Sequence, residues 1–220
     1  MTRELDSARR GAPKGQASSL VIFLHGYGAN GADLLGLADP LAPHMPDTAF
    51  YAPDAPEACT YNPMGFQWFP IPWLDGSSHE AAERSMKAAL GDVSAFLDKV
   101  LEDEGLEPEN SILFGFSQGA MMSLHLAPRR SRPVAGVVGF SGRLLEPGRL
   151  QDEVVSKPPV LLVHGDADEV VPPRSLPEAA DALTAAGFEV HTHVSTGVGH
   201  GIAPDGLSKA VAFMKDRLRV

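Results

Sequence analysis

Apolar runs bounded by glycine or proline divide the chain into regular elements. Five of these runs are short and rich in β-branched residues, which predicts strands buried on both faces. They read SLVIFLHG, TAFYAPD, SILFGFS, VAGVVGFSG and PVLLVHGD. A sixth run, FEVHTHVS, alternates apolar and polar residues, as expected for an edge strand with one solvated face. The pattern therefore predicts six strands.

Helical spacing is found between these strands. The clearest helical pattern covers residues 79–104, where apolar residues recur three or four positions apart on one face: Met86, Leu90, Val93, Leu97 and Leu101. Other helical patterns cover residues 118–126, 173–186 and 205–218. A repeated strand–helix order is typical of parallel strands joined by helical crossovers. The expected fold class is α/β, with a doubly wound, mostly parallel sheet and helices on both faces.

The length of the chain indicates one domain. A chain of 220 residues can bury a substantial core, and no internal repeat or linker interrupts this one. We expect a single domain over residues 18–220, preceded by an N-terminal extension, residues 1–17, with freedom to move. One segment, residues 52–78, has no clear periodicity. Long segments of this kind are usually functional, often as a wall or lid of a binding site.

Charge and cysteine content narrow the choice of partners and compartment. The net charge of -10 repels phosphate backbones and anionic membrane surfaces, so nucleic acid is not an expected partner. No stretch approaches 18 uninterrupted apolar residues and residues 1–15 lack the apolar core of an export signal, so stable membrane insertion is not expected either. Cys59 is the one cysteine, which excludes an internal disulfide. A cytoplasmic location is therefore expected.

The pentapeptide GFSQG, residues 115–119, is the first candidate for chemistry. In a G-x-S-x-G motif the serine occupies a strained turn between a strand and a helix, and the glycines allow the two elements to pack closely. A strand-like run precedes Ser117 and a helix-like run follows it, so Ser117 is a candidate nucleophile. The alternative is a serine in a tight turn. Ser141, in GFSGRL, also ends an apolar run, but its second glycine follows immediately, which favours a turn serine.

A serine nucleophile needs a general base and an acid that orients the base. In this fold they follow the serine in the order acid, then histidine, each on a loop after a strand. Asp166 is the last residue of the run PVLLVHGD, and Asp168 follows two residues later. We favour Asp168, because an Asx turn is the simpler explanation of Asp166. His200 lies between two glycines after the last predicted strand. None of the other seven histidines combines this order with such a loop.

The tetrahedral intermediate of acyl transfer also needs hydrogen-bond donors for its oxyanion. One expected donor is the backbone N–H of Gln118, directly after the candidate nucleophile. The second is the backbone N–H of Tyr27, in the loop FLHGYGANGADL that follows an early strand. This loop could instead be a simple glycine-rich connection or a phosphate cradle, but it lacks the G-x-G-x-x-G order and a Walker lysine.

Taken together, FLHGYGANGADL, GFSQGAMMSL, GFSGRL, HGDADEVVP and GVGHGI resemble the small carboxylesterase and acyl-protein thioesterase family of α/β-hydrolases. The resemblance extends from about residue 18 to about residue 218. It implies an α/β-hydrolase fold, a triad of Ser117, Asp168 and His200, and oxyanion donors at Tyr27 and Gln118. It implies no metal and no cofactor. Relatives often pair, which makes a homodimer the expected assembly, although the pattern itself leaves the oligomeric state open.

In the family, the segment after the second strand forms part of the substrate pocket. Here it carries closely spaced apolar side chains, of which we expect four to bind substrate: Met64, Phe66, Trp68 and Phe69. Ile71 and Trp73 lie close by, and the prolines from Pro63 to Pro72 break any regular element there. Ordinary core is the alternative for these side chains. Many relatives read Trp-Tyr-Asp where this chain has WFP, residues 68–70, so the shape of the pocket differs.

The expected function is hydrolysis of short- to medium-chain carboxylic esters, with thioesters as a further substrate class, through an acyl intermediate on Ser117. Only about twenty residues separate the fourth and fifth runs, where larger relatives insert a cap domain, so no cap and an open site are expected. A lysophospholipase or a dienelactone-type hydrolase is the alternative within the hydrolases. A non-catalytic ligand-binding protein of the same fold is a less favoured alternative, and a scaffold protein finds no support.

Overall fold

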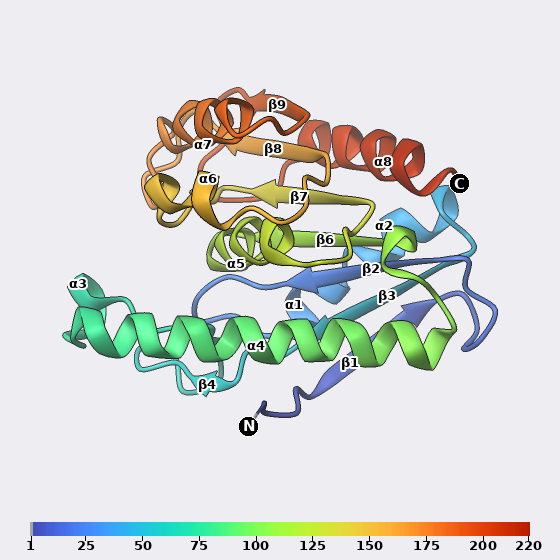
Figure 1. The fold of residues 1–220 in the computed structure, drawn as a ribbon, viewed down its shortest axis with the longest axis horizontal. Coiled ribbons are helices and arrows are strands. Elements are labelled where there is room, and N and C mark those ends of the chain that lie inside the picture. The colour runs from blue at the N-terminus through green and yellow to red at the C-terminus, as the bar shows by residue number, and fades with distance from the viewer. Residues whose placement is uncertain (1) are drawn as a thin grey trace.

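A seven-stranded sheet runs through the centre of the computed structural model, which describes residues 2–220 (Figure 1). The strand order is β1-β3-β2-β6-β7-β8-β9; β1 is antiparallel to β3 and every other neighbouring pair is parallel. The strands are β1 (Ser7–Gly11), β2 (Ser19–Leu24), β3 (Thr48–Pro53), β6 (Ser111–Phe116), β7 (Gly136–Phe140), β8 (Val160–Gly165) and β9 (Val190–Ser195). The predicted doubly wound, mostly parallel sheet is confirmed.

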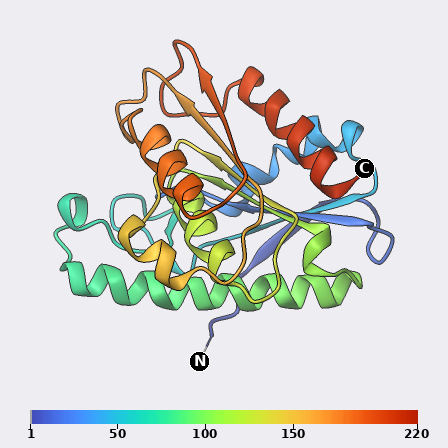
Figure 2. The same cartoon turned by 45° about the horizontal axis from the view of Figure 1, so that its top comes forward.

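Helices cover both faces of this sheet (Figure 2). One face carries α1 (Gly31–Leu35), α2 (Ala38–Leu41) and α8 (Pro204–Leu218). The other carries α4 (His79–Glu104), α5 (Gln118–Leu126), α6 (Leu150–Glu153) and α7 (Ser175–Ala185). Short 3-10 helices lie at Ala42–His44, Pro108–Asn110, Ala127–Arg129 and Pro147–Arg149.

Strand β2 shows why the central runs are apolar at every position. Leu20, Ile22 and Leu24 belong to the core beneath α4, α5 and α7, whereas Val21 and Phe23 belong to the core beneath α1, α2 and α8. All five side chains are fully buried. Successive side chains of a strand point to opposite faces, so a strand covered on both sides needs apolar residues throughout.

Helix α4 has the bounds that its apolar spacing predicts. At its start, the Ser78 side chain accepts a hydrogen bond from the Ala81 N–H and satisfies one of the free donors of the first turn. At its end, Gly105 adopts a left-handed conformation with φ of 68°, which glycine tolerates without steric cost. The helix crosses most of the length of the molecule (Figure 1).

The segment over residues 52–78 is folded, although its sequence shows no periodicity. It contains a small hairpin, β4 (Glu57–Ala58) paired with β5 (Phe66–Gln67), and a short helix, α3 (Pro72–Asp75). An isolated bridge joins Ala29 to Phe66, so the hairpin is also attached to the loop after β2. The short strands escape sequence analysis because two-residue strands are too brief to show an alternating pattern.

A segment near the N-terminus, residues 7–11, is part of the sheet. Residues 7–11 lie within the expected N-terminal extension, yet they form β1 and pair along their whole length with β3. The sequence SARRG has no apolar alternation because its side chains are largely exposed and the backbone carries the pairing. The folded domain therefore begins before residue 18.

A buried ion pair fixes this edge strand to α4. The Glu104 carboxylate is fully buried and accepts hydrogen bonds from Arg9 Nε at 2.7 Å, the Tyr51 hydroxyl at 2.7 Å and the Gly15 N–H at 3.1 Å. Burial alone raises the pKa of Glu104, but these three donors outweigh it and the net pKa is lowered. Burial and the same carboxylate raise the pKa of Tyr51 to about 12.

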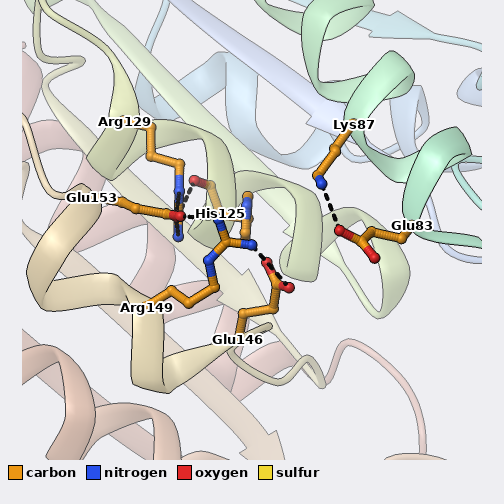
Figure 3. A network of polar contacts seen from close by, with 7 residues as sticks. All are labelled: Glu83, Lys87, His125, Arg129, Glu146, Arg149 and Glu153. Carbon is orange, nitrogen blue, oxygen red and sulfur yellow. Dashed lines mark hydrogen bonds and ion pairs between the residues drawn. The ribbon is translucent and has the colours of Figure 1, made fainter. Parts of the chain in front are cut away.

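The connection between β7 and β8 holds the short helix α6, which ion pairs attach to neighbouring residues. Arg129 Nε donates to Glu153 at 2.8 Å, Arg149 contacts the same carboxylate at 2.5 Å, and Arg129 Nη1 also donates to the His125 carbonyl at 2.7 Å (Figure 3). Burial, followed by the charge of Arg129, lowers the pKa of His125. These contacts hold α6 against the end of α5, and residues 141–159 contain no inserted domain.

Replacement of Glu104 by alanine is expected to lower the free energy of unfolding by about 2 kcal/mol, because Arg9 and Tyr51 lose their shared acceptor while Arg9 stays partly solvated. Urea unfolding at neutral pH measures this change. Since the pKa of Glu104 lies below its usual 4.5 in the folded protein, the stabilisation is complete above that pH and is lost as the pH falls through the folded-state pKa. The difference in the free energy of unfolding between wild type and Glu104→Ala should therefore become smaller as the pH is lowered.

The control is Glu102→Ala, on the same helix but exposed, which should leave the unfolding curve unchanged. A Glu104→Ala difference that is absent at neutral pH, or that grows with acid, would contradict this role of the carboxylate.

Candidate functional site

The candidate residues meet at one edge of the sheet because each follows the carboxyl end of a parallel strand. Tyr27 follows β2, Ser117 follows β6, Asp168 follows β8 and His200 follows β9. Strand order brings these loops together, since β2, β6, β7, β8 and β9 are consecutive neighbours in the sheet. Ligands of open α/β sheets bind at this edge.

Ser117 occupies a strained turn between β6 and α5. Its backbone has φ of 53° and ψ of -115°, a conformation that a residue with a side chain rarely adopts. The Ser117 N–H donates to the Phe140 carbonyl at 2.8 Å, and the Ser117 carbonyl accepts from the Met121 N–H at 3.1 Å. The residue is 8% exposed. The turn that the G-x-S-x-G motif predicts is present.

The glycines of the motif are required by close backbone contacts. A Cβ on Gly119 would lie 1.9 Å from the Leu24 carbonyl oxygen, and a Cβ on Gly115 would lie 2.3 Å from the Gly119 carbonyl oxygen. Gly26, in the loop after β2, also lies against the turn, since a Cβ there would be 3.3 Å from Ser117 Cβ. The expected oxyanion loop therefore lies directly against the candidate nucleophile.

Asp168 and His200 form a hydrogen-bonded pair. His200 Nδ1 lies 2.8 Å from Asp168 Oδ2, a carboxylate oxygen that can only accept, so the proton of a neutral ring sits on Nδ1 and Nε2 is left as the basic nitrogen. The ring also packs on Phe116, with ring centres 4.9 Å apart, next to Ser117 in the chain. No hydrogen bond joins Ser117 Oγ to His200 within residues 2–220; without substrate this bond is often long.

The Asp168 carboxylate is held in its charged form. Its side chain is fully buried, and burial alone raises its pKa. The hydrogen bond with His200 and the N–H groups of Val171 and Val170, both 2.9 Å from Oδ1, outweigh burial and lower the pKa of Asp168. His164 Nε2, which bonds the Val171 carbonyl at 2.9 Å, lies 3.3 Å from Oδ2. His164 is a buried histidine near the end of β8, and its contacts support the loop that carries Asp168.

Asp166 has a different place in the structure. It is exposed, and its Oδ1 accepts a hydrogen bond from the Gly197 N–H at 2.6 Å. The expected turn bond to its own neighbours is replaced by this contact across to the loop after β9. Of the two aspartates, Asp168 contacts His200, and Asp166 ties down the loop that carries His200.

The loop after β2 is fastened to the hairpin. The Gly28 N–H donates to the Phe66 carbonyl and the Phe66 N–H donates to the Ala29 carbonyl, each at 2.8 Å, and Asn62 Nδ2 donates to the Gly28 carbonyl at 2.7 Å. No backbone carbonyl within residues 2–220 accepts a hydrogen bond from the Tyr27 N–H. That N–H is therefore available to an oxyanion.

Gln118 contributes more than the sequence indicates. As the first residue of α5, it has a backbone N–H without an intrahelical partner, as the expected donor requires. Its side chain, for which we expected no part, forms two hydrogen bonds: Oε1 accepts from the Trp68 N–H at 2.9 Å and Nε2 donates to the Phe69 carbonyl at 2.8 Å. The sequence carries no signal for these contacts, because their partners lie about fifty residues away.

The four expected substrate-binding side chains do not form one surface. Met64 is 83% exposed, and Phe66 and Phe69 are partly buried against the main core. Trp68 is 0% exposed; its Nε1 donates to the His25 carbonyl at 2.8 Å and its ring packs on the His25 ring. Trp68 thus has no surface for a substrate and instead supports the loop after β2 from behind.

A cavity of the described structure lies away from these residues. It has a volume of about 380 Å³ and lies between the N-terminal residues and α4, lined by Arg3, Tyr51, Phe96 and Lys99 among others. None of the candidate site residues borders it. Within residues 2–220, no three His, Cys, Asp or Glu side chains are grouped closely enough to hold a metal ion, and no helix is both long and apolar enough to span a membrane.

Comparison with known proteins decides the family. The family model described as phospholipase/carboxylesterase matches residues 7–218. The chain belongs to this family. It is 31% identical over 217 residues to acyl-protein thioesterase 1 of Saccharomyces cerevisiae, covering 92% of this chain and 94% of that protein.

Solved structures of an esterase and of an acyl-protein thioesterase also match nearly the whole chain. The crystal structure of esterase PE8 matches with 42% identity and a TM-score of 0.92, covering 98% of this chain and all of that one. Acyl-protein thioesterase 2 of Zea mays matches with 26% identity and a TM-score of 0.76, over 97% and 99% of the two chains. The family resemblance and the α/β-hydrolase fold expected from the sequence are confirmed, and this member of the family is a hydrolase.

Replacement of Gly119 by alanine is expected to prevent the close contact of α5 with the end of β2, because the new Cβ would overlap a backbone oxygen that cannot move aside. We expect a loss of more than about 3 kcal/mol of stability or a failure to accumulate soluble protein. Thermal unfolding followed by circular dichroism measures it.

The matched control is Gly148→Ala, where no atom lies within 4 Å of the added Cβ and the backbone conformation suits any residue. This variant should unfold at the wild-type temperature. A Gly119→Ala protein as stable as the control would show that the elbow does not need the glycine.

Proposed function

We propose that this protein is a serine carboxylesterase that hydrolyses short- to medium-chain carboxylic esters through an acyl intermediate on Ser117. The observation that carries the proposal is the Asp168–His200 hydrogen bond placed beside the strained turn of Ser117. A charged, buried carboxylate at Nδ1 orients the imidazole and stabilises the positive charge that it gains as a base. The same three residues are those that the family resemblance implies.

The reaction takes two steps. His200 Nε2 removes the Ser117 hydroxyl proton as Ser117 Oγ bonds to the ester carbonyl carbon, and the resulting oxyanion accepts hydrogen bonds from the N–H groups of Tyr27 and Gln118. His200 then gives the proton to the departing alcohol as the ester bond breaks. Water repeats the sequence: His200 takes its proton, the hydroxide attacks the acyl group, and Ser117 recovers its proton as the acid leaves.

The substrate class follows from the relatives and from the missing cap. The relatives include proteins named as carboxylesterases and as acyl-protein thioesterases, so both esters and thioesters are proposed substrates here. The proposed apolar surface for the acyl group comes from Phe66 and Phe69, which are partly buried; the Phe69 carbonyl accepts from Gln118 Nε2. Without a cap over residues 141–159, the site is proposed to be open to soluble esters or to an acyl chain on a protein surface. Initial rates across acyl lengths separate this activity from lysophospholipase and dienelactone-type hydrolysis.

The proposed setting is the cytoplasm, since the single cysteine, Cys59, is buried and free, as a reducing compartment favours. A homodimer, which the family resemblance suggests, stays a prediction.

Replacement of Ser117 by alanine is expected to reduce hydrolysis of p-nitrophenyl acetate by at least about 10⁴-fold, because the proposed acyl intermediate forms on the hydroxyl that this change removes. A fluorophosphonate probe should label the wild type and leave Ser117→Ala unlabelled.

The control is Ser141→Ala, since Ser141 is a second buried serine with a positive φ at a strand end. It should keep probe labelling. Equal turnover by wild type and Ser117→Ala would overturn the proposed nucleophile, and an unlabelled, inactive wild type would favour a non-catalytic binding protein.

Replacement of Asp168 by asparagine is expected to lower kcat by about 10³- to 10⁴-fold with little change in KM, because an amide can donate to Nδ1 and so favours the tautomer that lacks a basic Nε2. Steady-state kinetics at neutral pH measure kcat and KM separately. Asp166→Asn is the control, because its amide oxygen can still accept from Gly197 and it should retain kcat within about threefold. The reverse ranking of the two variants would assign the acid to Asp166.

A further inference from the structure

The Gln118 side chain joins the candidate nucleophile turn to a distant segment. Gln118 is 1% exposed. Its side-chain amide bonds the backbone of two consecutive residues: it accepts from the Trp68 N–H at 2.9 Å and donates to the Phe69 carbonyl at 2.8 Å. A side-chain amide used in this way substitutes for a strand partner and fixes the position and the direction of the chain. A side chain that lacks both the acceptor oxygen and the donor N–H would leave the Trp68 N–H and the Phe69 carbonyl unpaired.

The same segment holds the loop after β2 through Trp68. The indole Nε1 donates to the His25 carbonyl at 2.8 Å, and the indole ring packs on the imidazole. His25 Nε2 accepts from the Ala55 N–H at 2.9 Å, which requires the ring proton on Nδ1, where it is donated to the Gly26 carbonyl at 2.8 Å. Burial lowers the pKa of His25 and so favours this neutral ring.

Residues 66–69 therefore bond to the two segments that carry the proposed oxyanion donors. Phe66 pairs with the backbone of Gly28 and Ala29, directly after Tyr27, and Gln118 bonds the chain at Trp68 and Phe69. The side chains of Phe66 and Phe69 are partly buried and belong to the segment that these hydrogen bonds position. The segment that carries the proposed acyl wall is thus joined by hydrogen bonds to the turns that carry the proposed oxyanion donors.

We infer that the Gln118 side chain is a positioning residue that sets the acyl specificity of the site by clamping the wall of Phe66 and Phe69 against the oxyanion donors. This inference rests on the proposed esterase function and goes beyond the backbone role of Gln118. The clamp holds the wall at a fixed distance from the reacting carbonyl, so a long acyl chain depends on it and an acetyl group does not.

The test is Gln118→Met, which keeps the length of the side chain and the backbone N–H but removes both hydrogen bonds. The ratio of kcat/KM for p-nitrophenyl octanoate to that for p-nitrophenyl acetate should fall by about fivefold or more relative to wild type. A merely structural loss would lower both values by one factor, and an unchanged ratio in folded protein would overturn the inference. Gln151→Met, the same change at an exposed position, should keep the wild-type ratio.

Gln118→Glu gives a conservative second variant, which also serves if Gln118→Met does not fold. Its carboxylate can accept from the Trp68 N–H but repels the Phe69 carbonyl, whereas its protonated form can donate to that carbonyl. The selectivity ratio should therefore move back toward the wild-type value as the pH is lowered from about 8 to about 6, since a buried carboxyl beside a carbonyl takes up a proton readily. A ratio that does not depend on pH would count against the clamp.

A readout that needs no activity uses the two tryptophans. In a Trp73→Phe background, Trp68 is the remaining indole and reports the position of the segment. Gln118→Met should shift its emission to longer wavelength and increase its quenching by acrylamide, and no change in either would overturn the clamp. A wild type that hydrolyses neither ester would instead overturn the proposed function, and the fluorescence would still decide whether the clamp exists.

Discussion

The strained backbone of Ser117 is the constraint on which the rest of the site depends. A left-handed φ at a residue with a side chain costs on the order of 1 kcal/mol or more and persists only where neighbouring contacts leave no alternative. Here the alternative is removed by packing, because α5 leaves the end of β6 in contact with the carbonyl oxygen of Leu24 on the adjacent strand. The turn cannot relax without moving β2 and α5 apart. Its position is therefore as rigid as the centre of the sheet.

A fixed Ser117 turn can serve catalysis only if the loops that carry the other site residues are also held in place. Different contacts hold each of these loops. The acid loop is braced by His164 and by two N–H groups of its own backbone. The histidine loop is tied by the Asp166 contact with Gly197. The loop after β2 is bonded to the hairpin and supported by Trp68. The contacts of the acid loop are local, but those of the histidine loop and of the loop after β2 join segments far apart in the chain, so tertiary structure holds these two loops in place.

This difference explains how far the sequence could predict the molecule. The central strands and the long helices can be predicted from the spacing of apolar residues along the chain. The helices over residues 79–104 and 118–126 have the predicted bounds. The edge strand β1 is missed because an exposed strand held by its backbone carries no apolar pattern. Chain order and motif context placed Ser117, Asp168 and His200 on neighbouring loops. The side chains of Gln118 and Trp68 could not be placed, because composition shows that an aromatic or an amide is present but not which way it faces.

Two histidines at strand ends show how partners, and not position, decide what a ring can do. His200 has a buried carboxylate at Nδ1, so a proton taken up at Nε2 creates a charge that already has its counter-charge. His25 has a carbonyl at Nδ1 and an N–H donor at Nε2, so a second proton would break the bond with Ala55 and place a charge in a buried site. The first ring is suited to exchange protons and the second to hold a loop. Both occur within a strand-end motif rich in glycine, and only the groups around them tell them apart.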